Sequence, residues 1–155
     1  MNKAVGGVVV LLVTVVCVLF LNGPTSQAEQ TLGKLFIKSA PTEVNGQQFT
    51  DKELEDSVKD LKAKTGKFVV VDNESEADFL LVVVKREVVV GRPNPLSPKT
   101  PRNVSDIKAT LSVKSDGKWN AGALLSSNGC CRSWSDSAGR VLKYVEDWVK
   151  ENAKK

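Results

Sequence analysis

The chain offers few side chains that could perform catalysis. It has 155 residues and no histidine, which excludes Ser-His-Asp and Cys-His arrangements and histidine-based zinc sites. The residue that most often acts as general acid or base near neutral pH is therefore missing. Paired carboxylates such as Glu53 and Asp56 fall on the water-facing side of an expected helix, where nothing would raise their pKa. We expect no catalytic residues, no cofactor and no bound metal.

Two adjacent cysteines, Cys130 and Cys131, are the remaining reactive pair. Neighbouring cysteines can form a strained vicinal disulfide, pair with another chain or stay reduced. A redox enzyme would normally carry Cys-x-x-Cys, and a zinc site would need further ligands at suitable spacing. The sequence therefore favours a structural or intermolecular disulfide at Cys130 and Cys131.

Residues 91–104 form a basic, proline-rich segment. Its three cations are Arg92, Lys99 and Arg102, and it has no acidic residue. Prolines at this density exclude a helix or a sheet interior, so we expect an exposed, extended loop. The segment is either a plain connector or a docking loop for a partner.

The three tryptophans are the other candidates for a binding surface. Trp119 and Trp148 fall on apolar faces by periodicity, so we expect both in the core. Trp134 precedes the last expected helix and stands near Arg132, which makes it the tryptophan best placed to contact a partner.

The first 28 residues have the pattern of a secretory signal peptide. One lysine is followed by an apolar run over 4–21, a helix-breaking Asn-Gly-Pro and small residues at Ser26 and Ala28. The alternative is an uncleaved membrane anchor, because the run approaches spanning length. We expect an exported, periplasmic or secreted domain over residues 29–155, whose 21 basic and 18 acidic side chains leave a net charge of only +3. This charge is too weak to indicate nucleic-acid binding.

Hydrophobic periodicity predicts two helices and five strands in this domain. One helix begins at a capping box of Thr50 and Glu53 and ends near Gly66, and the other begins at Ser135 or Asp136. The strands are expected over 34–37, 68–71, 77–90, 107–113 and 119–125. The strand over 68–71 is read as buried on both faces. The polar patch 85–87 is read as the place where a long strand leaves the core, with a tight turn as the alternative.

The last two strands are expected to form a hairpin. Its alternating apolar residues stay on one face if the loop has three residues, since Val113 would then lie opposite Trp119 and Leu111 opposite Ala121. A two-residue Asp-Gly loop would set Val113 opposite Asn120.

Together these elements predict an α+β domain with a single mixed sheet of about five strands and two helices on one face, in the order β-α-β-β-β-β-α. A right-handed crossover through the first helix would make the strands over 34–37 and 68–71 parallel.

The amphipathic helix, the run Thr65-Gly66-Lys67-Phe68-Val69-Val70-Val71-Asp72 and the step Glu76-Ala77-Asp78-Phe79 resemble small bacterial envelope domains. These are the amino-terminal domain of the Tol-Pal propeller protein, the lipoprotein activators and the curli-secretion family. The chain departs from them where Val83 or Val84 stands in place of a usual glycine, and it lacks the lipobox of the lipoprotein members. The resemblance implies a binding or assembly role in the envelope and no catalytic site.

The sequence therefore favours a non-enzymatic exported domain that binds another envelope or secreted macromolecule, most simply a protein. A small-ligand or glycan binder and an enzyme of unrecognised type are the alternatives.

Overall fold

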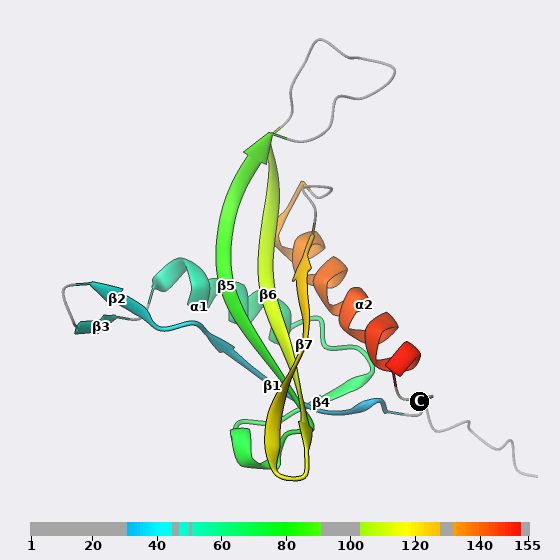
Figure 1. The fold of residues 1–155 in the computed structure, drawn as a ribbon. Helices are drawn as coiled ribbons and strands as arrows, with labels where there is room; N and C mark the ends of the chain where they lie inside the picture. The colour runs from blue at the N-terminus through cyan, green and yellow to red at the C-terminus, as the bar shows by residue number, and fades with distance from the viewer. Residues whose placement is uncertain (1–30, 45–46, 50, 91–102, 128–131, 153–155) are drawn as a thin grey trace, which may run out of the picture. The chain divides into compact units, whose positions relative to one another are not determined.

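One mixed sheet of five strands carries two α-helices on one face (Figure 1), the α+β arrangement that the sequence predicts. The computed structural model describes residues 31–44, 47–49, 51–90, 103–127 and 132–152. The sheet strands are β1 (Gly33–Ser39), β4 (Phe68–Val70), β5 (Phe79–Val90), β6 (Asn103–Ser115) and β7 (Lys118–Ser126). The helices are α1 (Lys52–Lys62) and α2 (Trp134–Asn152), with a 3₁₀ turn, η1, at Glu74–Glu76.

The strand order is β4-β1-β5-β6-β7. β1 runs parallel to both β4 and β5, which confirms the expected crossover through α1. β5, β6 and β7 are successive antiparallel neighbours. A separate small hairpin pairs β2 (Thr42–Val44) with β3 (Gln47–Phe49).

The core lies between the sheet and the two helices. Leu54 and Leu61 of α1 meet Val141 and Val145 of α2 in one buried cluster, while Trp148 packs against its margin. Each helix therefore buries one apolar face, as the hydrophobic periodicity of the sequence predicts. Burial of these stripes is what fixes α2 against the sheet.

The capping of α1 differs from the expectation. Asp51, one residue after Thr50, is the N-cap, and its carboxylate accepts a hydrogen bond from the Glu53 N–H at 2.8 Å. An aspartate here also places negative charge at the positive end of the helix dipole. The helix ends at Lys62 with Ala63 as its C-cap, so Gly66 (φ +52°) lies in the following turn and does not occupy the C′ position.

The strand near residue 68 is shorter and less buried than expected. β4 lies at one edge of the sheet, where Phe68 is buried but Val69 is 46% exposed. The unbroken β-branched run does not indicate burial on both faces here, because an edge strand has a neighbour on one side only.

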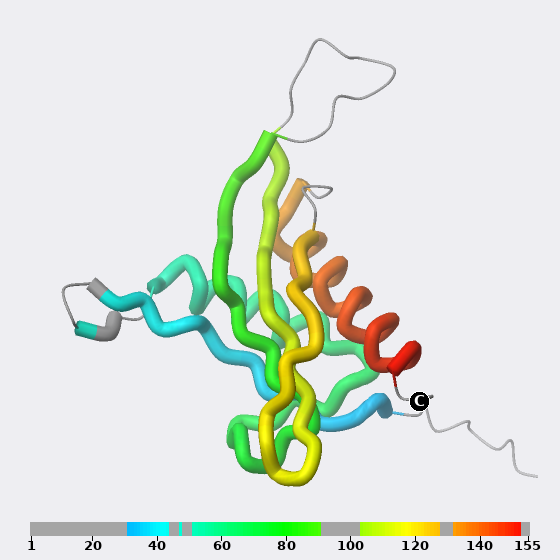
Figure 2. Tube along the Cα trace, in the orientation of Figure 1, coloured from blue at the N-terminus to red at the C-terminus, as the bar shows by residue number. Residues whose placement is uncertain are grey.

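β5 and β6 form the longest pair, and they run side by side along their full length (Figure 2). The polar patch 85–87 remains in β5, so the alternative turn there is wrong. A register shift between Val83 and Lys85 moves Val84 out of the ladder. β6 begins at Asn103, so the last two residues of the proline-rich segment are strand, and residues 91–102 lie outside the described part.

The β6–β7 hairpin has a two-residue loop, so the expected register is wrong. Ser115 pairs with Lys118, and both loop residues have positive φ, Asp116 at 52° and Gly117 at 75°. This is the turn geometry whose twist matches that of the strands. A bulge at Gly122 then restores the apolar face, because Leu111 pairs with Ala123 beyond it.

Candidate binding groove at the edge of the sheet

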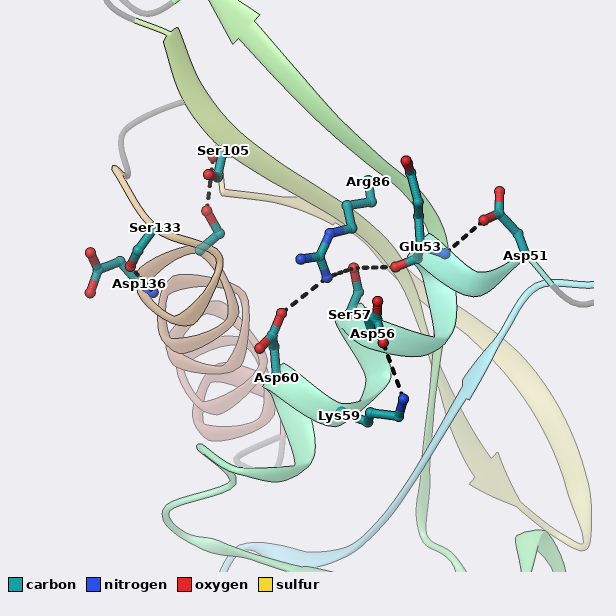
Figure 3. Close-up of polar contacts among 11 residues, drawn as sticks. Asp51, Glu53, Asp56, Ser57, Lys59, Asp60, Arg86, Ser105, Ser133 and Asp136 are labelled. Carbon is teal, nitrogen blue, oxygen red and sulfur yellow. Dashed lines mark hydrogen bonds and ion pairs between the residues drawn. The ribbon is translucent and has the colours of Figure 1, made fainter.

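An arginine junction connects β5 with α1 and with the start of α2, and Figure 3 shows its hydrogen bonds to α1. Arg86 donates from one guanidinium nitrogen to Ser57 Oγ at 3.2 Å and to Asp60 Oδ2 at 3.0 Å. Its guanidinium carbon lies 4.0 Å from the centre of the Trp134 ring. The bulge at Val84 turns Arg86 to the helix face, where its side chain is only 12% exposed.

A second polar contact fixes α2 against β6. The Ser137 hydroxyl, which is fully buried, donates to the Ser105 carbonyl at 2.8 Å. Buried hydroxyls of this kind restrict how a helix can shift, since moving it would leave a polar atom unsatisfied. These two contacts therefore hold α2 in place beside the sheet.

The bulge at Gly122 determines which side chains of β7 face α2. Beyond it, Leu125 pairs with Ala109 on the core face and is 8% exposed, while Leu124 pairs with Thr110 on the opposite face and is 72% exposed. Gly122 itself lies close to Trp148: a Cβ placed on it would be 3.4 Å from the indole. The glycine therefore allows this close approach of the Trp148 ring to β7.

β7 has a free edge. Within the described residues, β6 is its sole strand partner. The Ser127 N–H donates to the Ile107 carbonyl, and hydrogen-bonded positions alternate along an antiparallel pair. Leu125 and Ala123 therefore direct their backbone groups toward β6, and Leu124 directs its N–H and C=O away from the sheet.

A groove of about 670 Å³ runs between this edge and α2. We call it the β7–α2 groove, and it is lined by Leu124, Leu125, Ser126, Tyr144, Asp147, Trp148 and Glu151. The helix contributes a stripe at positions 144, 147, 148 and 151, adjacent to its buried stripe. The groove thus combines an unpaired strand edge with aromatic rings and carboxylates.

Among the described residues, the groove lining has two carboxylates and no cation. Asp147 is paired at its rim with Lys143, whose Nζ lies 3.2 Å from the carboxylate. Glu151 makes no ion pair within the described part of the chain, and it is exposed. The rim cation Arg140 donates to the Tyr144 hydroxyl at 3.1 Å, which orients that ring. The lining is therefore acidic on a domain whose overall charge is positive.

The opposite face of the sheet carries an ion-pair cluster. Glu87 accepts from Lys108 at 2.8 Å and lies 2.7 Å from Lys85. The hydrogen bond from Lys108, followed by that from Lys85, lowers the pKa of the Glu87 carboxyl. Lys108 in turn has a raised pKa, chiefly through its hydrogen bond to Glu87. All three side chains are partly exposed, so the cluster is a surface feature.

Of the candidate site residues that the sequence singles out, the structure describes Trp134 alone. Arg92, Lys99, Arg102, Cys130 and Cys131 lie outside the described residues. Trp134 is half-buried beneath Arg86 and packs against the core, so it serves the arginine junction.

The other two tryptophans have different surroundings from each other. Trp119 pairs with Lys114, whose ammonium lies 5.6 Å from the ring centre, on the face away from the helices. Its expected core position is wrong, because the two-residue loop shifts the register. Trp148 is half-buried in the groove.

In the described ranges no cluster of three or more metal-ligating side chains occurs, and no helix there is long and apolar enough to cross a bilayer.

Sequence reasoning missed the groove and the role of Arg86. The adjacent Leu124 and Leu125 were the available signal, since two neighbouring leucines in an alternating strand cannot both face the core. Arg86 gave no signal, because its burial depends on the bulge at Val84.

No protein-family model matches the chain, and no curated protein matches it in sequence. Two solved structures are similar in part. The hypothetical protein CT253 from Chlamydia trachomatis has 7% identity and a TM-score of 0.42, with 76% of this chain and 99% of that chain covered. A minor lipoprotein from Acinetobacter baumannii has 12% identity and a TM-score of 0.37, with 77% and 92% covered. At these scores neither similarity bears on what the chain binds.

Proposed function

We propose that this chain is a non-enzymatic, exported binding domain that takes up an extended segment of another envelope or secreted protein as an added strand at β7. Its role would be accessory or assembly-related. The observation that carries the proposal is the free edge of β7 beside the β7–α2 groove. Strand addition draws affinity from main-chain hydrogen bonds and specificity from pockets for alternate side chains.

The exposed edge is open to such a partner. Proteins usually protect edge strands with proline, inward charges, short length or bulges. β7 has nine residues and no proline, and its bulge lies at the central Gly122, so residues 123–126 pair regularly with β6. Leu124 lies in this regular half and directs its N–H and C=O outward, where an added strand could begin pairing.

A proline substitution tests the edge selectively. Leu124→Pro removes an outward N–H and leaves the β6–β7 ladder intact, so the variant should keep most of its free energy of unfolding. Leu125→Pro, the matched control, removes a ladder hydrogen bond and a core side chain and should cost about 3 kcal/mol or more.

The binding assay uses a random peptide library displayed on phage, selected on residues 29–155. We expect enriched peptides to bind the parent and to lose about tenfold or more in affinity for Leu124→Pro. Peptides that bind this variant equally well would contradict strand addition. Selective capture of oligosaccharides, unaffected by the proline, would favour a glycan site instead. If the variant does not fold, the NMR amide signal of Leu124 in the parent is followed as peptide is added. A shift of this signal would support strand addition, and an unchanged signal would contradict it.

Export is a separate part of the proposal and needs its own test. The mature protein should begin at Glu29, as the signal-peptide pattern of residues 1–28 predicts. Intact mass of the protein recovered from expressing cells decides this. A mass that retains residues 1–28 would mean that the segment stays as an anchor.

A further inference from the structure

We propose that the segment accepted at β7 carries lysine or arginine on its helix-facing side. This rests on the proposed function and adds the chemistry of the ligand. A strand that continues the sheet past β7 would alternate its side chains between the two faces. The side chains on the face shared with Leu125 would point toward α2, because α2 covers that face.

The surface that those side chains would meet is acidic and aromatic. Asp147, Trp148 and Glu151 all line the groove from α2. A lysine or arginine can place its aliphatic stem along the tryptophan ring and its charge beside a carboxylate. Glu151 makes no ion pair with another described residue.

The rim cations do not cancel this preference. Lys143 is engaged with Asp147 at 3.2 Å, and Arg140 lies over the Tyr144 ring at 5.3 Å from its centre. Neither of them lines the groove. An acidic segment would meet two carboxylates there, and like charges at short range are unfavourable.

Two synthetic peptides of about eight residues provide the test, a usual strand length. One alternates threonine with lysine and the other alternates threonine with glutamate. The net charge of the mature domain is +3 and by itself favours the glutamate peptide. A preference for the lysine peptide would therefore be a local property of the groove. We expect it to bind residues 29–155 about fivefold more tightly than the glutamate peptide at low salt, and less selectively at high salt.

Two charge reversals locate the effect. Glu151→Lys should abolish or reverse the preference, whereas Glu76→Lys, which changes the net charge equally at an exposed site in η1, should preserve it. Equal binding of both peptides, abolished by Leu124→Pro, would overturn the charge preference and leave strand addition standing. Absence of lysine-peptide binding, or an equal effect of both reversals, would also overturn it.

Discussion

At the scale of single residues, Arg86 shows how a charged side chain is used inside the domain. Its ion pair with Asp60 and its contact with Trp134 join three elements at one point. The sequence could not predict this, because the surrounding patch 85–87 reads as polar surface and only the bulge at Val84 turns Arg86 inward. Lysine would not substitute well, since it lacks the planar group that stacks on the indole.

We expect Arg86→Ala to lower the free energy of unfolding by about 2 kcal/mol, because it removes a charged hydrogen-bond donor and leaves Asp60 and Ser57 without this partner. Arg86→Lys should recover only part of the loss. Lys85→Ala, at the neighbouring exposed position, is the matched control and should change stability little. Urea denaturation of the three variants measures this, and equal midpoints for Arg86→Ala and the parent would contradict the role of the junction.

Glu87 gives the domain a pH dependence at low pH. Because its pKa in the folded state is below the ordinary value of 4.5, the native ion pairs stabilise the fold above that value. This contribution is lost as the pH falls below 4.5 and through the lowered pKa. Glu87→Gln should therefore flatten the stability profile in this range. Denaturation midpoints between pH 6 and 3 test it, and parallel profiles for parent and variant would count against the cluster.

At the scale of elements, the helices were the most predictable parts. Their apolar stripes recur over several turns, so an error of one residue at a cap, as at Thr50 and Asp51, does not change which face is buried. The β6–β7 hairpin was less predictable. Its loop and the bulge at Gly122 act together, and periodicity alone cannot distinguish that pair of features from a longer loop with no bulge.

Two glycine substitutions with opposite expected effects test the turn of the β6–β7 hairpin and the helix α2. Gly117→Ala should lower stability by about 1 kcal/mol, because position 117 has φ +75°. Gly139→Ala should raise it by about 0.5–1 kcal/mol, because this position lies inside α2 and an added Cβ would meet nothing within 4 Å. Thermal melting of both variants compares them. A neutral Gly117→Ala would mean that the turn is not of the observed type.

At the scale of the whole domain, the fold class followed from the order of elements, but the candidate site did not. The sequence directed attention to Arg92, Lys99 and Arg102, which lie outside the described residues. The groove depends on which strand lies at the edge, and strand order beyond nearest neighbours cannot be derived from periodicity. It also depends on the bulge at Gly122, which moves side chains of β7 from one face to the other.

The amide of Leu124 tests the central claim most directly. Hydrogen exchange followed by NMR on residues 29–155 should show a fast-exchanging Leu124 N–H and a protected Leu125 N–H, because the first faces the free edge and the second faces β6. Addition of a peptide selected on this domain should then protect Leu124. Protection of Leu124 in the free protein, or exchange at Leu124 that a bound peptide leaves unchanged, would contradict strand addition at β7.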